Sequence, residues 1–240
     1  MTERFIVPEE NGGNGFLEDA CVVYGEEAAM VISDSIISGL GYAQAMLSLD
    51  NIDTLRLHLA VMRPPGKHDR DHPVHAWANG SENSIAFMIN PDATTAEIAE
   101  SLYRAVPHEL GHIAHYRCNP KFGNESAEAK PYNHFSSAIQ EGIARSAEVL
   151  ENPDANILAR GFYKYRLGIK EGVRLLLDPE ATADFESYDV LYGNIKELDD
   201  VYAIGHYVVS SLALAEKRDF QALLRTPLME YVEIAQAELT

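Results

Sequence analysis

The chain has 240 residues, of which 46% are hydrophobic, so it can bury a sizeable core as one compact unit with two lobes. Its 37 acidic and 19 basic residues give a net charge of -18, and a polyanion repels phosphate backbones, which argues against a nucleic-acid partner. No run of about 18 uncharged apolar residues is present, so we expect no membrane span.

The N-terminus and the cysteines bear on location. Met1 to Arg4 show neither the basic segment nor the apolar stretch that begins a secretory signal. The two cysteines, Cys21 and Cys118, are too few for a disulfide framework. We therefore expect a cytoplasmic protein with free thiols, and the oligomeric state stays open.

The first part of the chain alternates between helix and strand signals. Residues 4–24 indicate a turn and a short strand, and residues 26–49 have apolar residues at helical spacing. Residues 54–62 alternate leucine and valine with other residues, which is typical of a half-buried strand, and residues 84–90 predict a second strand. Between these strands we expect a polar loop over residues 63–82, with ordinary surface histidines at His68, His72 and His75.

A capping box precedes the next helix. Thr94 and Glu97 have the spacing at which each side chain satisfies a backbone N–H of the other residue. The helix should continue to about Tyr116, with Pro107 inside it. Since an interior proline removes a backbone hydrogen bond, we expect a kink near Tyr103 or a new start of the helix there.

The second part of the chain predicts helices only. After a loop over residues 117–133, residues 136–150 are helical, and most of residues 155–240 forms several helices, with breaks at Pro179, at Gly193 and at Thr226-Pro227. Strands cluster before the helices, so the predicted class is α+β: one unit, with residues 1–116 as the lobe that contains the sheet and residues 117–240 as the helical lobe.

The most informative motif is His-Glu-Leu-Gly-His, residues 108–112. His108 and His112 are one helical turn apart, about 6 Å along the axis, so their imidazoles can converge on one metal ion. Glu109 lies at the rim of the same face, where it can reach a metal-bound water without binding the metal. A catalytic zinc has three protein ligands as a rule, so one ligand remains to be found.

Three candidates for the third ligand follow the motif. In the metzincin spacing the glycine position is occupied by His115 and the last ligand position by Cys118, so the chain cannot turn there. His115 itself lies about 10.5 Å along the helix from His108, which strains coordination of one ion, and a surface or outer-shell position suits it better. Glu141 is on the next predicted helix, where Gly142 allows a close helix approach, and we favour it as the ligand.

His-Glu-x-x-His followed by a helix with Glu-Gly-x-Ala resembles the gluzincins, the clan of thermolysin and of the zinc aminopeptidases of the leukotriene-hydrolase type. The similarity is closer to bacterial zinc-dependent proteases known from their predicted peptidase domain, and it covers about residues 85–148. It implies a zincin-like fold and one Zn²⁺ per chain, held by His108, His112 and Glu141, with Glu109 as the general base.

The chain departs from the thermolysin pattern in two ways. The interval between His112 and Glu141 is longer, and the position four residues after the ligand glutamate is Arg145 where thermolysin-like chains have an aspartate that holds a histidine. Glu148, one turn later on the same face, could take the place of that aspartate.

The chemistry that this resemblance implies is hydrolysis of a peptide bond. Zinc lowers the pKa of a bound water to about 7, and Glu109 accepts its proton and passes it to the leaving amine. A further side chain should stabilise the oxyanion, and Tyr202 and His206, one turn apart, are the favoured source, although they are also compatible with an aromatic stripe packed in a core. His134 is a weaker candidate.

The expected partner is a peptide or protein substrate. Residues 85–89 could form an edge strand that pairs with an extended peptide, or a plain interior strand. A zincin-like scaffold that binds partners without catalysis is the alternative function, and a chance occurrence of the motif is the third; the presence of Glu109 favours hydrolysis, because a scaffold has no need of a base.

Overall fold

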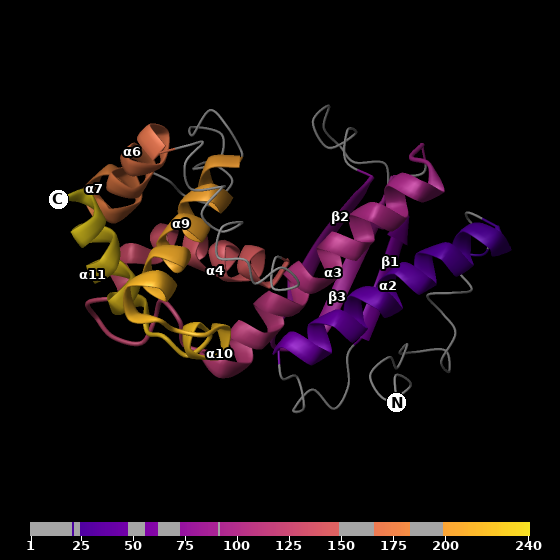
Figure 1. The fold of residues 1–240 in the computed structure, drawn as a ribbon, viewed down its shortest axis with the longest axis horizontal. Coiled ribbons are helices and arrows are strands. Elements are labelled where there is room, and N and C mark those ends of the chain that lie inside the picture. Colours follow the sequence, from indigo (N-terminus) through magenta and orange to yellow (C-terminus); the bar gives the residue numbers. More distant parts are fainter. Residues whose placement is uncertain are drawn as a thin grey trace. The chain divides into compact units, whose positions relative to one another are not determined.

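The computed structural model describes residues 21, 25–47, 56–61, 73–90, 92–148, 166–182 and 199–240. The chain divides into two compact units, residues 1–114 and residues 115–240. The first unit combines a sheet with helices and the described part of the second is helical, so the class is α+β as predicted (Figure 1). None of the described helices is long and apolar enough to cross a membrane.

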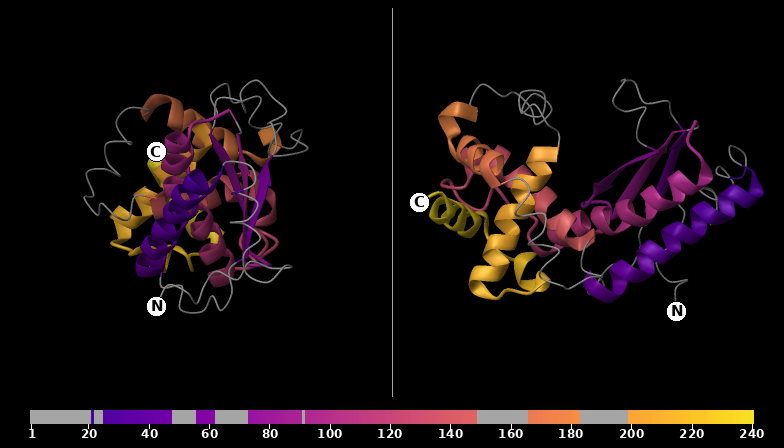
Figure 2. Two further views of the ribbon diagram at one scale, coloured as in Figure 1. Left: turned by 90° about the vertical axis from the view of Figure 1, so that its right-hand side faces the viewer. Right: turned by 45° about the horizontal axis from the view of Figure 1, so that its top comes forward.

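The first unit contains a three-stranded sheet and two long helices. Its elements are α2 (Glu26–Leu47), β1 (Arg56–Val61), β2 (Val74–Asn79), β3 (Ser84–Ile89) and α3 (Thr95–Cys118), and the last residues of α3 belong to the second unit. The strand order is β1-β3-β2, with β1 parallel and β2 antiparallel to β3. Helices α2 and α3 lie on one side of this sheet (Figure 2).

One expectation for this region was wrong, and one alternative that the sequence left open is now decided. Strand β2 lies inside the predicted loop over residues 63–82, where it pairs with β3 from Val74↔Ile89 to Asn79↔Ser84. Strand β3 is bonded on both sides, so it is the interior strand of the sheet and cannot take a peptide along its edge. The predicted strand over residues 4–24 lies outside the described residues, except for Cys21, which is helical.

The core of the first unit follows the periodicity of its elements. Alternate residues Ile85, Phe87 and Ile89 of β3 are completely buried, as period two requires for one face of a strand. Helix α3 contributes residues at helical spacing, from Ile98 and Leu102 onward, and α2 contributes a further stripe. The buried apolar side chains that the structure describes on the two helices within this unit are Ala29, Ile32, Ile36, Leu40, Ile98, Leu102, Val106, Leu110, Ile113 and Ala114.

Helix α3 begins as predicted and runs without a break. The side chain of Glu97 accepts hydrogen bonds from the N–H and the hydroxyl of Thr94, and the Thr94 hydroxyl accepts one from the Glu97 N–H. These bonds also lower the pKa of the Glu97 carboxyl. The helix continues through Pro107 to Cys118, so it does not restart at Tyr103. At the proline it passes close to α2, where a Cβ on Gly39 would stand 2.9 Å from the Cβ of Val106.

The second unit is built around a pair of helices. Its elements are the 3-10 turn η3 (Lys130–Tyr132), α4 (Asn133–Glu148), α6 (Arg166–Leu177), α7 (Pro179–Thr182), α9 (Asp199–Glu216), α10 (Phe220–Leu223) and α11 (Leu228–Leu239). The breaks predicted at Pro179 and at Thr226-Pro227 match the ends of these helices, and the break at Gly193 lies outside the described residues.

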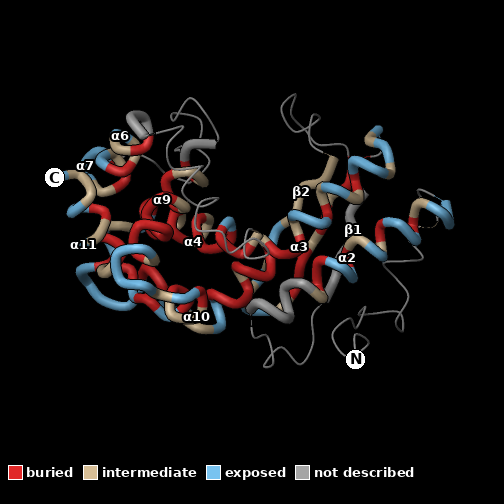
Figure 3. The backbone as a smooth tube through the Cα atoms, viewed as in Figure 1, coloured by how far each residue is buried: buried red, intermediate tan, exposed pale blue. Residues whose placement is uncertain are grey.

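Helix α9 is the centre of this unit. It packs against α4, α6, α10 and α11, and Figure 3 shows buried residues along both α4 and α9. The two helices approach so closely that a Cβ on Gly142 would stand 2.1 Å from the carbonyl carbon of Gly205. Glycine at both positions therefore lets the two backbones touch. This contact fixes the position of the turn of α4 that contains Glu141.

Candidate metal centre

Helix α3 brings the two histidines of the motif together. The Nε2 atoms of His108 and His112 are 3.2 Å apart, and their rings meet edge to face with centroids 4.9 Å apart. Both side chains are half-buried. The one-turn spacing on a continuous helix produces this geometry directly, because residues four apart stand on the same face.

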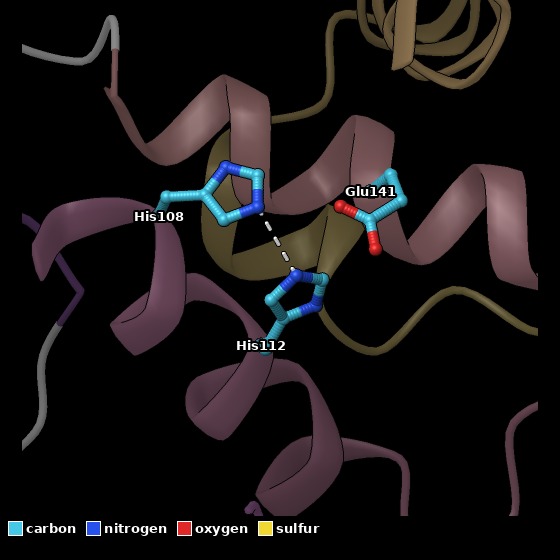
Figure 4. Close-up of side chains that lie close together, drawn as sticks. All are labelled: His108, His112 and Glu141. Carbon is cyan, nitrogen blue, oxygen red and sulfur yellow. Dashed lines mark hydrogen bonds between the residues drawn. The ribbon is translucent and has the colours of Figure 1, made fainter. Parts of the chain in front are cut away.

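Glu141 completes a group of three donors. One ligand atom from each of His108, His112 and Glu141 lies within 4.8 Å of the others, and no other such group occurs among the described residues. Figure 4 shows the carboxylate of Glu141, from α4, turned toward the two imidazoles of α3. The carboxylate that we predicted as the third donor is therefore at the histidine pair.

The donor geometry fits a metal ion. Two nitrogens on a tetrahedral zinc, each about 2.1 Å from the ion, stand about 3.4 Å apart, and the observed separation of the two Nε2 atoms is 3.2 Å. The same distance also suits a hydrogen bond between the two imidazoles, which can form when no ion is bound. Two imidazoles and one carboxylate form a donor set that zinc accepts, and other divalent ions take the same ligands.

Glu109 occupies the position expected of a base. It follows His108 on α3, its side chain is only 6% exposed, and it has polar interactions within the protein. Burying a carboxylate costs several kcal/mol unless charge or hydrogen bonding compensates, so its place beside two histidines that could hold a metal ion is consistent with a functional role.

The two candidates for the oxyanion are on α9. Tyr202 and His206 are half-buried residues one turn apart, as predicted. The Nε2 atom of His206 is buried without a hydrogen-bond partner in the described part of the chain. Burial lowers the pKa of His206 to about 4, and the positive charge of Arg145 contributes to this decrease, while Glu148 opposes it. His206 is thus neutral at pH 7. The role of Tyr202 and His206 in stabilising an oxyanion stays a prediction.

Among the described residues, the other histidines and cysteines do not join this group. His115 is 2% exposed and packs edge to face on Phe122, with ring centroids 4.5 Å apart, so it is a core residue where we expected a surface or outer-shell one. His134 is buried at the start of α4, and Cys118 is a half-buried thiol. His75 lies on β2, whereas His68 and His72 lie outside the described residues.

The nearness of Arg145 and Glu148 to His206 escaped the sequence analysis, which considered the first two residues only as neighbours of Glu141 on the same helix. Arg145 and Glu148 stand one and two turns after Glu141 on α4, and both act electrostatically on His206 of α9. The spacing Glu-x-x-x-Arg-x-x-Glu does place all three α4 residues on one face, so the signal was present in the sequence. The nearness of His206 comes from the contact between the two helices, which no local pattern encodes.

Searches of protein-family models, of curated proteins and of solved structures find no match to this chain. The conclusions about function therefore depend on the residues and on their arrangement.

Proposed function

We propose that this protein is a zinc-dependent peptidase of zincin-like architecture, in which His108, His112 and Glu141 hold the ion and Glu109 is the general base. The observation that carries the proposal is the group of three donor atoms within 4.8 Å of one another, next to a buried glutamate. The order of sheet, motif helix and helix with the third ligand supports the zincin-like fold.

In this proposal each residue of the site has a distinct role in hydrolysis of the peptide bond. A bound zinc ion would acidify a coordinated water and polarise the substrate carbonyl. The Glu109 carboxylate takes a proton from the attacking water as its oxygen bonds to the carbonyl carbon. It then delivers this proton to the amide nitrogen as the C–N bond breaks. Tyr202 or the neutral His206 would donate a hydrogen bond to the oxygen on which negative charge develops.

Metal analysis of the purified protein tests the first half of the proposal. We expect about one zinc per chain in the native protein, loss of the ion in His108→Ala and in Glu141→Ala, and full retention in Glu109→Gln. Glu97→Gln is the matched control, because it removes an exposed glutamate of α3 that lies far along the helix from the motif. Stoichiometric zinc after both ligand substitutions would refute the ligand set.

Peptide cleavage tests the second half. Incubation of the zinc-loaded protein with a mixture of peptides of diverse sequence, followed by mass spectrometry, should give cleavage products that the Glu109→Gln protein does not form. Removal of a general base decreases turnover by at least about 100-fold. A native protein that binds zinc and cleaves no peptide would instead support the catalytically silent scaffold.

A further inference from the structure

Helices α4 and α9 together contain one arginine and no lysine, whereas both contain acidic residues. That arginine, Arg145, follows Glu141 by four residues and is therefore displaced by only about 40° around the helix axis and about 6 Å along it. A guanidinium, which stays protonated at any physiological pH, thus shares a helix face with the proposed metal ligand.

The surroundings of Arg145 leave its donor groups available. Its side chain is 52% exposed, and its ion pair with Glu148 spans 3.7 Å, which is longer than a hydrogen bond. Within the described part of the chain the guanidinium makes no hydrogen bond. The planar fork of five N–H donors that arginine presents to a carboxylate is thus not engaged by Glu148.

Helix stability does not explain the Arg145–Glu148 pair. Glu148 is the last residue of α4, where a negative charge opposes the helix dipole, and the order arginine before glutamate is the less favourable one for a pair on a helix. Glu148 is only 15% exposed, however, and it stands beside both Arg145 and His206. This position suits a residue that orients the guanidinium. Since burial keeps His206 neutral at pH 7, the arginine is the fixed positive charge of this group.

We propose that Arg145 is a specificity-determining residue that binds a carboxylate of the substrate within two residues of the scissile bond, and that Glu148 orients it. An extended peptide advances about 3.4 Å per residue, so one helical turn of α4 corresponds to one or two residues of substrate. The carboxylate is either the C-terminal one or that of an acidic side chain. This inference depends on the proposed metal centre.

Binding of small hydroxamates tests the inference without turnover. The probes are the monohydroxamates of succinic, glutaric and adipic acid, which differ in spacer length, and their neutral amide counterparts. The hydroxamate group binds to zinc, while the carboxylate or the amide reaches beyond it. Calorimetry on the zinc-loaded Glu109→Gln protein gives the ratio of the dissociation constants of amide and acid for each length.

We expect the acid of the best length to bind about tenfold more tightly than its amide, as a charge-assisted pair contributes. In Arg145→Gln this ratio should fall to about one, while the amide binds as before. Arg145→Lys keeps the charge without the fork and should be intermediate. In Glu148→Gln the ratio should decrease toward one, because the guanidinium loses the side chain that orients it.

Arg174→Gln is the matched control. Arg174 is on α6 of the same unit, is 49% exposed, and also pairs with a glutamate three residues away. It should leave the ratio unchanged. An equal preference for the acid with and without the Arg145→Gln substitution would overturn the role of Arg145. So would the absence of any preference for the acid when Arg145 is present. If neither acid nor amide binds to the native protein, the metal centre itself fails, which is a different result.

The source of the carboxylate is decided in the active protein. Matched peptides carry either a free or an amidated C terminus, and either glutamate or glutamine next to the cleaved bond. Preference for the free C terminus assigns the C-terminal carboxylate, and preference for glutamate assigns a side chain. Cleavage that is indifferent to both substitutions contradicts the proposal.

Discussion

The carbonyl oxygen of Ala138 lies 1.7 Å from the position that a Cβ atom on Gly205 would occupy. No side chain can stand that close to a backbone atom, so α4 and α9 can keep their contact only with glycine at position 205. The same contact includes Gly142, which follows Glu141 directly. The spacing of two helices thereby sets the position of the proposed ligand.

Gly205→Ala should therefore weaken both the fold and the metal centre. The added methyl group forces α4 away from α9, and overpacking of this kind costs about 1–3 kcal/mol. Because Glu141 moves with α4, we expect zinc affinity to fall about 10–100-fold, the range found when groups that orient a metal ligand are lost. Urea unfolding measures the loss of stability. Competition with a chelator, under conditions in which the variant is still folded, measures the loss of zinc affinity.

Gly41→Ala is the control for this substitution. Gly41 is also inside a helix, but nothing stands within 4 Å of its Cβ position. Alanine there should stabilise the protein by up to about 1 kcal/mol, because it favours the helix and restricts the unfolded chain. If Gly205→Ala kept the zinc affinity of Gly41→Ala, the helix contact would have no bearing on the metal centre.

Zinc should protect the folded protein against heat. A ligand that binds only the native state at 100 times its dissociation constant adds about 2.7 kcal/mol to the free energy of unfolding. For a chain of this size that corresponds to an increase of about 5–10 °C in the unfolding midpoint. Calorimetric scans with zinc and with excess chelator measure this difference. Glu141→Gln should abolish most of it, whereas Glu97→Gln should retain it in full.

The hydroxyl of Tyr231, which is not part of the candidate metal centre, should contribute to the stability of the fold. This side chain is fully buried, and its hydroxyl donates a hydrogen bond to the carbonyl oxygen of Leu223, 2.9 Å away. Tyr231→Phe leaves that carbonyl without this donor, and we expect a loss of about 1–2 kcal/mol. Urea unfolding with the zinc content held constant measures this loss. A variant as stable as the native protein would mean that water replaces the hydroxyl.

The elements that sequence analysis located were those whose signals are local. The capping box fixed the start of α3 because Thr94 and Glu97 bond each other, and the one-turn spacing of His108 and His112 needed only a helix. Glu141 was a less secure choice, since no local pattern brings α4 to the histidines. Its selection depended on Gly142 beside it and on the motif that precedes it, and the three donors do stand together.

Strand β2 was missed because its own residues argue weakly for a strand. Its side chains are half-buried or exposed, and histidine and asparagine interrupt the apolar residues. Pairing with β3 decides its conformation, and such tertiary contacts outweigh strand propensity. The turn did leave a signal: Asn79-Gly80 is a common hairpin sequence, and Asn83 adopts the left-handed conformation that asparagine tolerates.

The buried imidazole of His206 should make the stability of the metal-free protein depend on pH. Its pKa is lowered from 6.5 to about 4 in the folded protein, mainly by burial, so below pH 6.5 the unfolded chain takes up a proton that the folded protein does not. Binding of protons by the unfolded state favours unfolding. The stability contribution of the neutral imidazole is thus intact above pH 6.5 and decreases by about 3 kcal/mol as the pH falls to 4.

Urea unfolding across this pH range measures the effect. His206→Gln should remove this part of the pH dependence, because glutamine has no proton to gain, and His75→Gln, which removes a half-exposed imidazole from β2, should not. Arg145→Gln should make this loss of stability smaller, since the guanidinium contributes to the low pKa of His206. Its positive charge disfavours a second one on the imidazole, and without it the imidazole takes up its proton more readily in the folded state. The pKa of His206 then rises toward its ordinary value, so the total loss between pH 6.5 and 4 becomes smaller. An unchanged pH profile of stability in Arg145→Gln would mean that Arg145 and His206 do not interact. The interpretation of Arg145, Glu148 and His206 as one electrostatic group beside Glu141 would then be wrong.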